Sequence, residues 1–371
     1  MRVLLVRSES TGGIGTHVSA LEAGLKEGGI PADTLRATGI LGVRNVRNRV
    51  ADYDVVHAHG IRAGAVACVA LGRRARRAQR LIVTVHNAPL PGGGLRGTAR
   101  RAVSTLLERV IARRADVVLG ASLDLVKRAE SLGAREVRFS PVSAALLGPP
   151  TRTRTEARAE FGVGPDDPVV ILLAVGRLAP QKDYPTLLAA SELLQGLCRI
   201  SGTKRAEALV LIAGDGPLRA GLQARIDAEH LPVRLLGHRT DVPNLLCAAD
   251  AFVMCSAWEA RPLAIQEALR AGVPVVATRV GGIPDLVGTA ADLVAPGDPR
   301  ALADALGTLL WKPLGDQPSN PEPRTRVGGW FDAFDADDEL AAVLAVYGDR
   351  QPPDGEPGCE TRISPGGGPG R

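Results

Sequence analysis

Hydrophobic positions along this chain form short apolar runs that alternate with amphipathic segments. In the first part of the chain, five runs rich in Val, Leu and Ile are bounded by turn residues, and they cover residues 3–6, 54–59, 81–86, 115–122 and 136–142. Segments of helical period lie between them, as at residues 16–29 and 122–134, and each has a Gly where a helix would end. Strands that alternate with helices predict a parallel sheet with right-handed crossovers.

The alternation stops at residues 149–168, which are polar and rich in Pro and Gly, and then restarts. A second series of apolar runs covers residues 169–178, 208–218, 233–238, 250–256 and 273–282, and helical patterns cover residues 185–197, 219–230, 241–249, 262–271 and 298–310. The chain is therefore predicted to be an α/β protein with two doubly wound parallel-sheet domains and a cleft between them. Their predicted bounds are residues 1–165 and 166–330.

The end of the chain differs from these two units. Residues 331–350 contain an amphipathic helical pattern at 337–349, whereas residues 351–371 are rich in Pro and Gly. We expect the tail from residue 351 onward to be disordered because it has too few apolar residues to pack.

Length and composition agree with two cores of ordinary size. The chain has 371 residues and only 3% aromatic residues, so aliphatic side chains must fill the cores. Its cysteines are odd in number and none is in a CxxC pair, which favours reduced thiols; they are Cys68, Cys198, Cys247, Cys255 and Cys359. The first apolar run is far shorter than a signal-peptide core, and no run is long enough to span a bilayer, so we expect a cytoplasmic protein.

Charge is distributed unequally between the two parts of the chain. Residues 1–150 carry 23 Lys and Arg against 11 Asp and Glu, whereas the remainder carries 22 against 29. The basic excess is concentrated at residues 73–80 and 95–114. Solvated helix faces are one interpretation; attraction to an anionic membrane surface or an anionic acceptor is the other. We expect no nucleic-acid partner.

Ligands of parallel α/β sheets bind beyond the carboxyl ends of the strands, so candidate residues are sought there. The first strand is followed by TGGIGTH, in which Gly12 and Gly13 allow a ligand to approach the backbone and the amides of the next helix. The spacing is not GxGxxG, and a plain tight turn is an equally good interpretation.

Histidines gather at the ends of the second and third strands. His86 ends the third strand and is the candidate to meet a sugar hydroxyl or phosphate, whereas His57 and His59 share one face of the second strand. These two could equally be satisfied polar residues at a sheet edge. No histidine has metal-ligand spacing to Cys or carboxylates, so no metal site is predicted.

The second domain carries two cations at one strand end. Arg177 directly follows a strand and Lys182 comes five residues later, which suits binding of a diphosphate at two points, although both could be solvated surface residues. Further along, AGDGPLR ends another strand with Gly214 and Gly216, where a turn is the simpler explanation and ligand approach the second.

Two glutamates flank the start of one predicted helix. Pro262 suits its first turn and Gly272 its end, so Glu259 lies in the preceding loop and Glu267 more than one turn inside. Their carboxylates could accept hydrogen bonds from sugar or ribose hydroxyls, and the neighbouring VGGIP stretch adds Gly281 and Gly282. Alternatively, one glutamate interacts with the helix dipole and the other is exposed.

Together these motifs resemble the retaining glycosyltransferases of family 4, which have two Rossmann-like domains that face a central cleft. The resemblance extends to about Gly348 and rests on EARPLAIQE, GRLAPQKD, AGDGPLR, AGVPVVAT followed by VGGIP, and TGGIGTH. It implies a nucleoside diphosphate sugar donor held mainly by the C-terminal domain and an acceptor held mainly by the N-terminal one. It also implies that the final helix crosses back to the first domain.

The same resemblance implies roles for individual residues. Arg177 and Lys182 would neutralise the donor diphosphate, and Glu259 would contact the transferred hexose-type sugar. Ribose hydroxyls would donate to Glu267, and His86 would reach the reacting sugar. Gly12 and Gly13 would form a loop near the phosphates.

Retention without a covalent nucleophile fits attack on the face that the leaving phosphate vacates, and no cofactor is implied. The available Asp-x-Asp pairs precede a strand and a surface helix, so metal-independent transfer is expected.

Ala260 and Arg261 depart from the family pattern, and Ala260 would be strained if a positive φ were needed there. The alternatives are a sugar-nucleotide epimerase, a non-catalytic nucleotide-sugar or membrane-surface binding protein, and an NAD-dependent oxidoreductase, which lacks its fingerprint.

Overall fold

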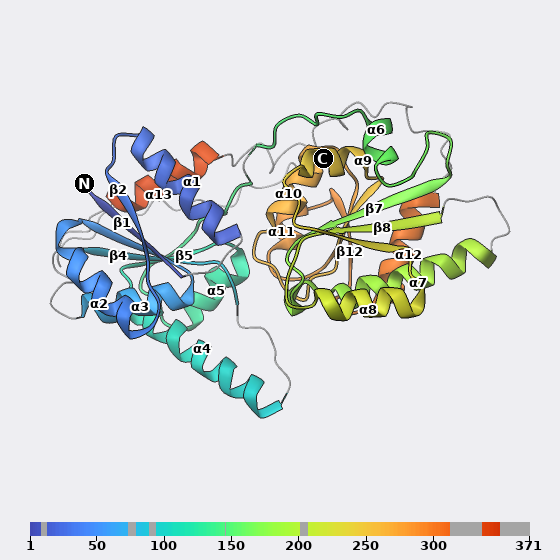
Figure 1. The fold of residues 1–371 in the computed structure, drawn as a ribbon. Helices are drawn as coiled ribbons and strands as arrows, with labels where there is room; N and C mark the ends of the chain where they lie inside the picture. Colours follow the sequence, from blue (N-terminus) through green and yellow to red (C-terminus); the bar gives the residue numbers. More distant parts are fainter. Residues whose placement is uncertain are drawn as a thin grey trace, which may run out of the picture.

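Two parallel sheets, each flanked by helices, lie side by side in the computed structural model (Figure 1). It describes residues 1–8, 13–72, 79–88, 94–144, 146–200, 207–311 and 336–348. The expected tail at 351–371 and the predicted site residue Gly12 lie outside these residues. The α/β fold class with two doubly wound sheets is confirmed.

The first sheet has six strands in the order β2-β1-β3-β4-β5-β6. Its strands are β1 (Val3–Arg7), β2 (Ala32–Arg36), β3 (Val55–His59), β4 (Arg80–Val85), β5 (Val117–Gly120) and β6 (Val137–Phe139). Its helices are α1 (Gly13–Glu27), α2 (Gly39–Arg49), α3 (Ile61–Leu71), α4 (Gly94–Arg114) and α5 (Leu123–Ser131). Because the strand order reverses beside β1, the ends of β1 and β3 form a topological switch point.

The second sheet repeats this plan in the order β12-β11-β10-β7-β8-β9. Its strands are β7 (Val169–Val175), β8 (Glu207–Ala213), β9 (Val233–Gly237), β10 (Ala251–Met254), β11 (Val275–Thr278) and β12 (Ala291–Val294). Its helices are α7 (Tyr184–Ile200), α8 (Arg219–Glu229), α9 (Val242–Ala248), α10 (Leu263–Arg270), α11 (Ile283–Val287) and α12 (Pro299–Trp311). Here the order reverses between β7 and β10, which places a second switch point at their ends.

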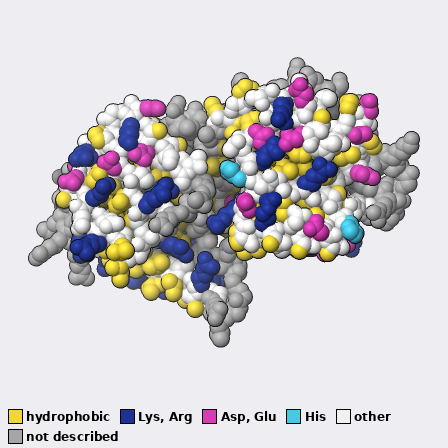
Figure 2. Space-filling model, viewed as in Figure 1, with side chains coloured by type: hydrophobic (Ala, Val, Ile, Leu, Met, Phe, Trp, Pro, Cys, Tyr) yellow, Lys and Arg dark blue, Asp and Glu magenta, His cyan; other side chains and the backbone are white. Residues whose placement is uncertain are grey.

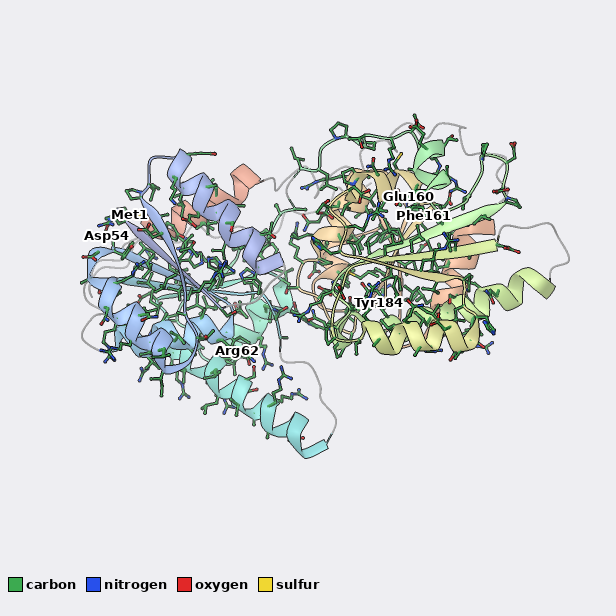
Figure 3. The ribbon with its side chains drawn as sticks, viewed as in Figure 1. Met1, Asp54, Arg62, Glu160, Phe161 and Tyr184 are labelled. Atoms are coloured by element: carbon green, nitrogen blue, oxygen red, sulfur yellow. The ribbon has the colours of Figure 1, made fainter. Side chains whose placement is uncertain are left out.

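The predicted linker contributes to the second domain. Residues 154–159 form α6 (Arg154–Ala159), which begins with a capping box between Thr153 and Glu156. Arg158 pairs with Asp250 at 2.8 Å, and Phe161 joins the core of the second domain. Glu160 and Phe161 lie between α6 and β7 (Figure 3). Packing with the second sheet therefore begins ahead of the predicted boundary at residues 165 and 166.

The final helix, α13 (Ala336–Gly348), packs against the first domain beside α1 (Figure 1). Val343 and Val346 join the core on that face of the first sheet. The Tyr347 hydroxyl lies 2.7 Å from His57 Nδ1, and both side chains are buried.

Within the described ranges, no helix combines the length and apolar character of a membrane span.

Candidate functional site

A cavity of about 780 Å³ lies between the two domains. Strand ends and helix starts of both sheets line it, including Ile14 of α1, His86 after β4, Gly176 after β7 and Pro262 before α10. Both switch points open toward this space, so its position follows from the strand order.

The cavity collects predicted residues from distant parts of the sequence. Its lining includes the predicted site residues His86, Arg177, Lys182, Gly214, Glu259 and Glu267. Gly13 is the first residue of α1. Gly216, Gly281 and Gly282 do not line the cavity and instead pack against the backbone of the loops that do.

Lys182 and Glu259 form an ion pair inside the cavity. Lys182 Nζ lies 2.8 Å from Glu259 Oε1, and the two side chains are only 19% and 11% exposed. Lys182 ends the 3₁₀ turn η3 (Pro180–Lys182) after β7, whereas Glu259 lies in the loop between β10 and α10. The pair therefore bridges the two strands at the switch point, where a donor diphosphate could compete for the ammonium group.

Hydrogen bonds hold the two loops of this pair together. Gln181 Nε2 donates to the Trp258 carbonyl at 2.9 Å, and the Ala257 amide donates to the Gln181 carbonyl at 2.8 Å. The Trp258 indole Nε1 donates to Asp124 Oδ2 of α5 in the first domain, at 3.0 Å. The loop before Glu259 is thus fixed on both sides.

Arg177 and Glu267 complete the polar wall of the second domain. Arg177 is exposed at the end of β7, and its guanidinium is available to solvent and ligands in the cavity. Glu267 is half-buried on α10, and burial raises the pKa of its carboxyl group while Arg270 opposes that shift. A half-buried carboxylate on the cavity wall is suited to accept hydrogen bonds from ligand hydroxyls.

The glycines of the second domain allow close backbone contacts. A Cβ on Gly281, where φ is +51°, would lie 1.9 Å from the Glu259 carbonyl oxygen. A Cβ on Gly214 would meet the Gly176 carbonyl oxygen at the same distance of 1.9 Å. The Gly282 amide donates to the Glu259 carbonyl at 2.9 Å. These glycines therefore position the loops of Arg177 and Glu259.

Ala260 shows no backbone strain. The only described non-glycine residues with positive φ are Asp183 and His230. The condition for strain at Ala260 is therefore not met, and its buried methyl group packs with the core of the first domain. Arg261 lines the cavity beside it.

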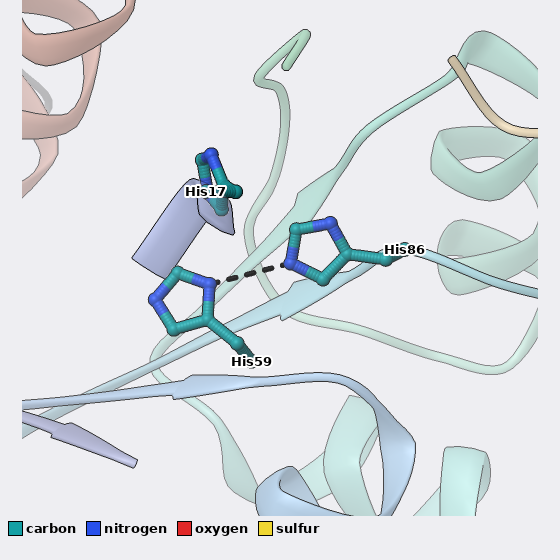
Figure 4. A group of neighbouring side chains, drawn as sticks. All are labelled: His17, His59 and His86. Carbon is teal, nitrogen blue, oxygen red and sulfur yellow. Dashed lines mark hydrogen bonds between the residues drawn. The ribbon is translucent and has the colours of Figure 1, made fainter. Parts of the chain in front are cut away.

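Four histidines lie together on the first-domain side. His57 and His59 share a face of β3, as predicted, with ring centroids 4.2 Å apart. His57 is satisfied by Tyr347 and by Thr84 Oγ1, which lies 2.6 Å from His57 Nε2. His59 Nδ1 lies 3.3 Å from His86 Nε2, and His17 of α1 faces both rings (Figure 4).

Burial keeps three of these imidazoles neutral. Burial, reinforced by the nearby His17, lowers the pKa of His57 to about 3. Burial also lowers the pKa of His59 and of His86 well below the usual range, and neighbouring histidines add to both shifts. Near neutral pH, these groups therefore act as lone-pair acceptors and single N–H donors.

Some cavity residues were not identified from the sequence. His17, Asp215 and His238 line the cavity but were not assigned a role there. His17 lies within TGGIGTH and Asp215 within AGDGPLR, both of which follow strands. His238 follows β9, so attention to every strand end would have found all three.

Two family models match most of the described chain. Residues 7–145 match the model of a glycosyl transferase 4-like domain. Residues 169–312 match the model of glycosyl transferases group 1. The two matches correspond to the first and second sheets with their helices.

Curated relatives are also glycosyltransferases. The chain is 32% identical over 291 residues to D-inositol 3-phosphate glycosyltransferase of Saccharomonospora viridis, covering 70% of this chain and 63% of the relative. It is 27% identical over 243 residues to UDP-Gal:alpha-D-GlcNAc-diphosphoundecaprenol alpha-1,3-galactosyltransferase of Escherichia coli, covering 62% of this chain and 59% of the relative. The matched segments thus span about three fifths of these relatives' own length.

Solved structures share the architecture. HepE of Anabaena, in complex with UDP and glucose, matches with a TM-score of 0.66 at 22% identity over 84% of this chain and 90% of that chain. Sucrose-phosphate synthase of Thermosynechococcus elongatus matches with a TM-score of 0.66 at 20% identity over 93% and 94% of the two chains. At these identities the likeness shows the fold. The two family models together cover most of the chain, and from them the chain belongs to the family 4 type of glycosyltransferases.

Proposed function

We propose that this protein is a retaining glycosyltransferase that moves a hexose-type sugar from a nucleoside diphosphate sugar to an acceptor without a metal ion. One observation carries the proposal: Arg177, Lys182 and a pair of glutamates line a single cavity at the switch point of the second sheet. The Escherichia coli relative is named for a UDP-sugar donor, UDP-Gal, which supports this donor class.

The charges of the cavity suit departure of a nucleoside diphosphate. Negative charge builds on the leaving phosphate as the glycosidic bond breaks, and Arg177 and Lys182 neutralise it in this proposal. Glu259 contacts the transferred sugar, whereas the ribose hydroxyls donate to Glu267. His86 meets the reacting sugar from the first domain. The acceptor attacks on the face that the phosphate leaves, and the proton that it loses passes to that leaving phosphate.

Donor binding and nucleotide release test this function together. We expect a UDP-, GDP- or ADP-sugar to raise the melting temperature of the protein and NAD to leave it unchanged. We also expect release of nucleoside diphosphate from that donor, and this release should persist in excess EDTA. Binding without release would favour a non-catalytic binding protein. Conversion of the sugar on the nucleotide without release would favour an epimerase. Loss of release on chelation would contradict metal independence.

Glu267→Gln should weaken donor binding about 10- to 100-fold, because hydrogen bonds to a charged group contribute about 1.5–3 kcal/mol. Titration calorimetry with the donor found above measures the dissociation constant. Glu229→Gln, at an exposed i,i+4 ion pair on α8, removes a glutamate charge from the same domain and is the control. Equal affinity in the Glu267 variant and the control would remove Glu267 from the donor site.

For the acceptor side, we propose that the first domain contacts an anionic membrane surface through α4. Val103 and Leu106 are 58% and 60% exposed on this helix, and Arg100 and Arg101 are exposed beside them. Hydrophobic and basic side chains lie together along the edge of the first domain where Figure 1 places α3 and α4 (Figure 2). Apolar side chains can insert between headgroups while arginines attract the anionic surface.

Vesicle co-sedimentation tests α4. We expect binding to phosphatidylglycerol-containing vesicles that weakens as salt rises, and a loss of most binding in an Arg100→Ala/Arg101→Ala variant. Arg225→Ala on α8 of the second domain removes a positive charge away from this surface and should bind as the parent does. Equal binding to neutral vesicles, or unchanged binding of the double variant, would contradict the proposal.

A further inference from the structure

The histidines on the first-domain wall have the arrangement of a metal site. His17, His59 and His86 each offer one ring nitrogen, and these three atoms all lie within 4.8 Å of one another. They come from α1, from the end of β3 and from the residue after β4 (Figure 4). Because these segments are far apart in sequence, ligand spacing did not reveal the group.

One distance in the group matches a metal site better than a hydrogen bond. His59 Nδ1 and His86 Nε2 are 3.3 Å apart, which is long for a hydrogen bond between nitrogens. Two nitrogen ligands of a tetrahedral Zn²⁺, with bonds of about 2.0–2.1 Å, are separated by about 3.3–3.4 Å. His59 and His86 are therefore already spaced as two ligands, and a ring nitrogen of His17 lies within 4.8 Å of both.

Hydrogen bonding within the group is also incomplete. His59 is fully buried, and its Nε2 atom has no hydrogen-bond partner among the described residues. Because His59 Nδ1 is the atom that faces His86, this Nε2 atom is the other ring nitrogen and would carry the proton of a metal-bound imidazole. His57, by contrast, uses both ring nitrogens on Thr84 and Tyr347, so it is not available as a fourth ligand.

We propose that His17, His59 and His86 form a binding site for a divalent transition metal ion of the zinc type. Three imidazoles leave a fourth position, and His17 and His86 line the cavity, so that position is open to water or a ligand oxygen. Buried neutral imidazoles are in the protonation state that binds metals. The site is on the first-domain wall, whereas the cations proposed for the diphosphate are on the second.

Metal titration of the full chain tests this site without reference to catalysis. Protein dialysed against EDTA and then freed of chelator is titrated with ZnCl₂ by calorimetry and with CoCl₂ by visible absorption. We expect about one ion per chain and the visible bands of four-coordinate Co²⁺ with nitrogen ligands. Thiolate-to-metal charge-transfer bands as the sole signal would indicate a cysteine such as Cys247 and overturn the proposal.

Two variants and a control identify the ligands. His17→Ala and His59→Gln should each weaken Zn²⁺ binding at least tenfold, roughly the least effect expected from removing a ligand. His17 is half-buried on α1, so its variant is the one to use if His59→Gln does not fold. His230→Asn, at an exposed histidine of the second domain, should bind as the parent does.

Unchanged affinity in the His17 variant, or no binding by the parent chain, would overturn the site. Either result would leave the proposed transfer reaction untouched, because nucleotide release is expected to persist in EDTA. Conversely, a metal site with three histidine ligands would stand even if no donor sugar were turned over.

Discussion

Lys182→Ala is expected to lower nucleoside diphosphate release at saturating donor by about 10²- to 10³-fold or more. Removing one group that stabilises developing negative charge typically costs about 2.7–4 kcal/mol in a water-poor site. Here a second effect is added, because Glu259 loses its partner at 2.8 Å and stays buried as an unpaired carboxylate. Initial rates over a range of donor concentrations give turnover separately from apparent affinity.

Two further variants separate these effects. Lys182→Met keeps much of the side-chain volume without the charge, and it should lose turnover to a similar extent. Adding Glu259→Gln to Lys182→Met should recover melting temperature but not turnover, because it removes the unpaired buried charge without restoring a cation. Arg225→Ala, at an exposed ion pair, should remain near parental activity. Near-parental turnover of Lys182→Met would remove Lys182 from the proposed leaving-group role.

Gly281→Ala is expected to destabilise the protein strongly and to reduce turnover as well. The new methyl carbon would lie 1.9 Å from the Glu259 carbonyl oxygen, at a φ of +51°. The left-handed backbone costs about 1–2 kcal/mol, and overpacking costs about 1–3 kcal/mol more. Relief of the clash must displace the loop that carries Glu259, so catalysis should fall together with the free energy of unfolding.

Gly288→Ala is a control for a methyl group added at a positive φ without a clash. Gly288 also has a φ of +51°, with a ψ of −115°, and a Cβ there would meet nothing within 4 Å. Its variant should show the backbone cost alone and retain turnover. Chemical denaturation compares the two free energies of unfolding. If Gly281→Ala kept parental turnover as Gly288→Ala is expected to do, the close packing against the Glu259 loop would not be what requires glycine at position 281.

The fold could be predicted wherever strands are buried on both faces. Central strands such as β7 and β10 contain continuous apolar runs, and their period and turn residues identified them. The edge strands β2 and β12 were missed because polar residues interrupt them and only partial burial is required there. The α6 helix was assigned to a linker because its polar face dominates, although Ala157 is buried against the second domain.

Which candidate residues lie close together could be predicted only in part. The carboxyl ends of parallel strands converge, so Arg177 after β7 and Glu259 after β10 could be assigned to one region in advance. The ion pair between Lys182 and Glu259 could not, because it depends on how two loops fold onto each other. The His17, His59 and His86 group likewise depends on contacts between a helix and two strands.

The hydrogen bond of Trp258 joins the two domains next to the ion pair of Lys182 and Glu259 in the cavity. Its indole is bonded to Asp124 of the first domain, and the next residue in the chain is Glu259. Any separation of the two domains would break this hydrogen bond or pull on the peptide that carries the Glu259 carboxylate. The hydrogen bond therefore links the spacing of the two domains to the position of Glu259 relative to Lys182.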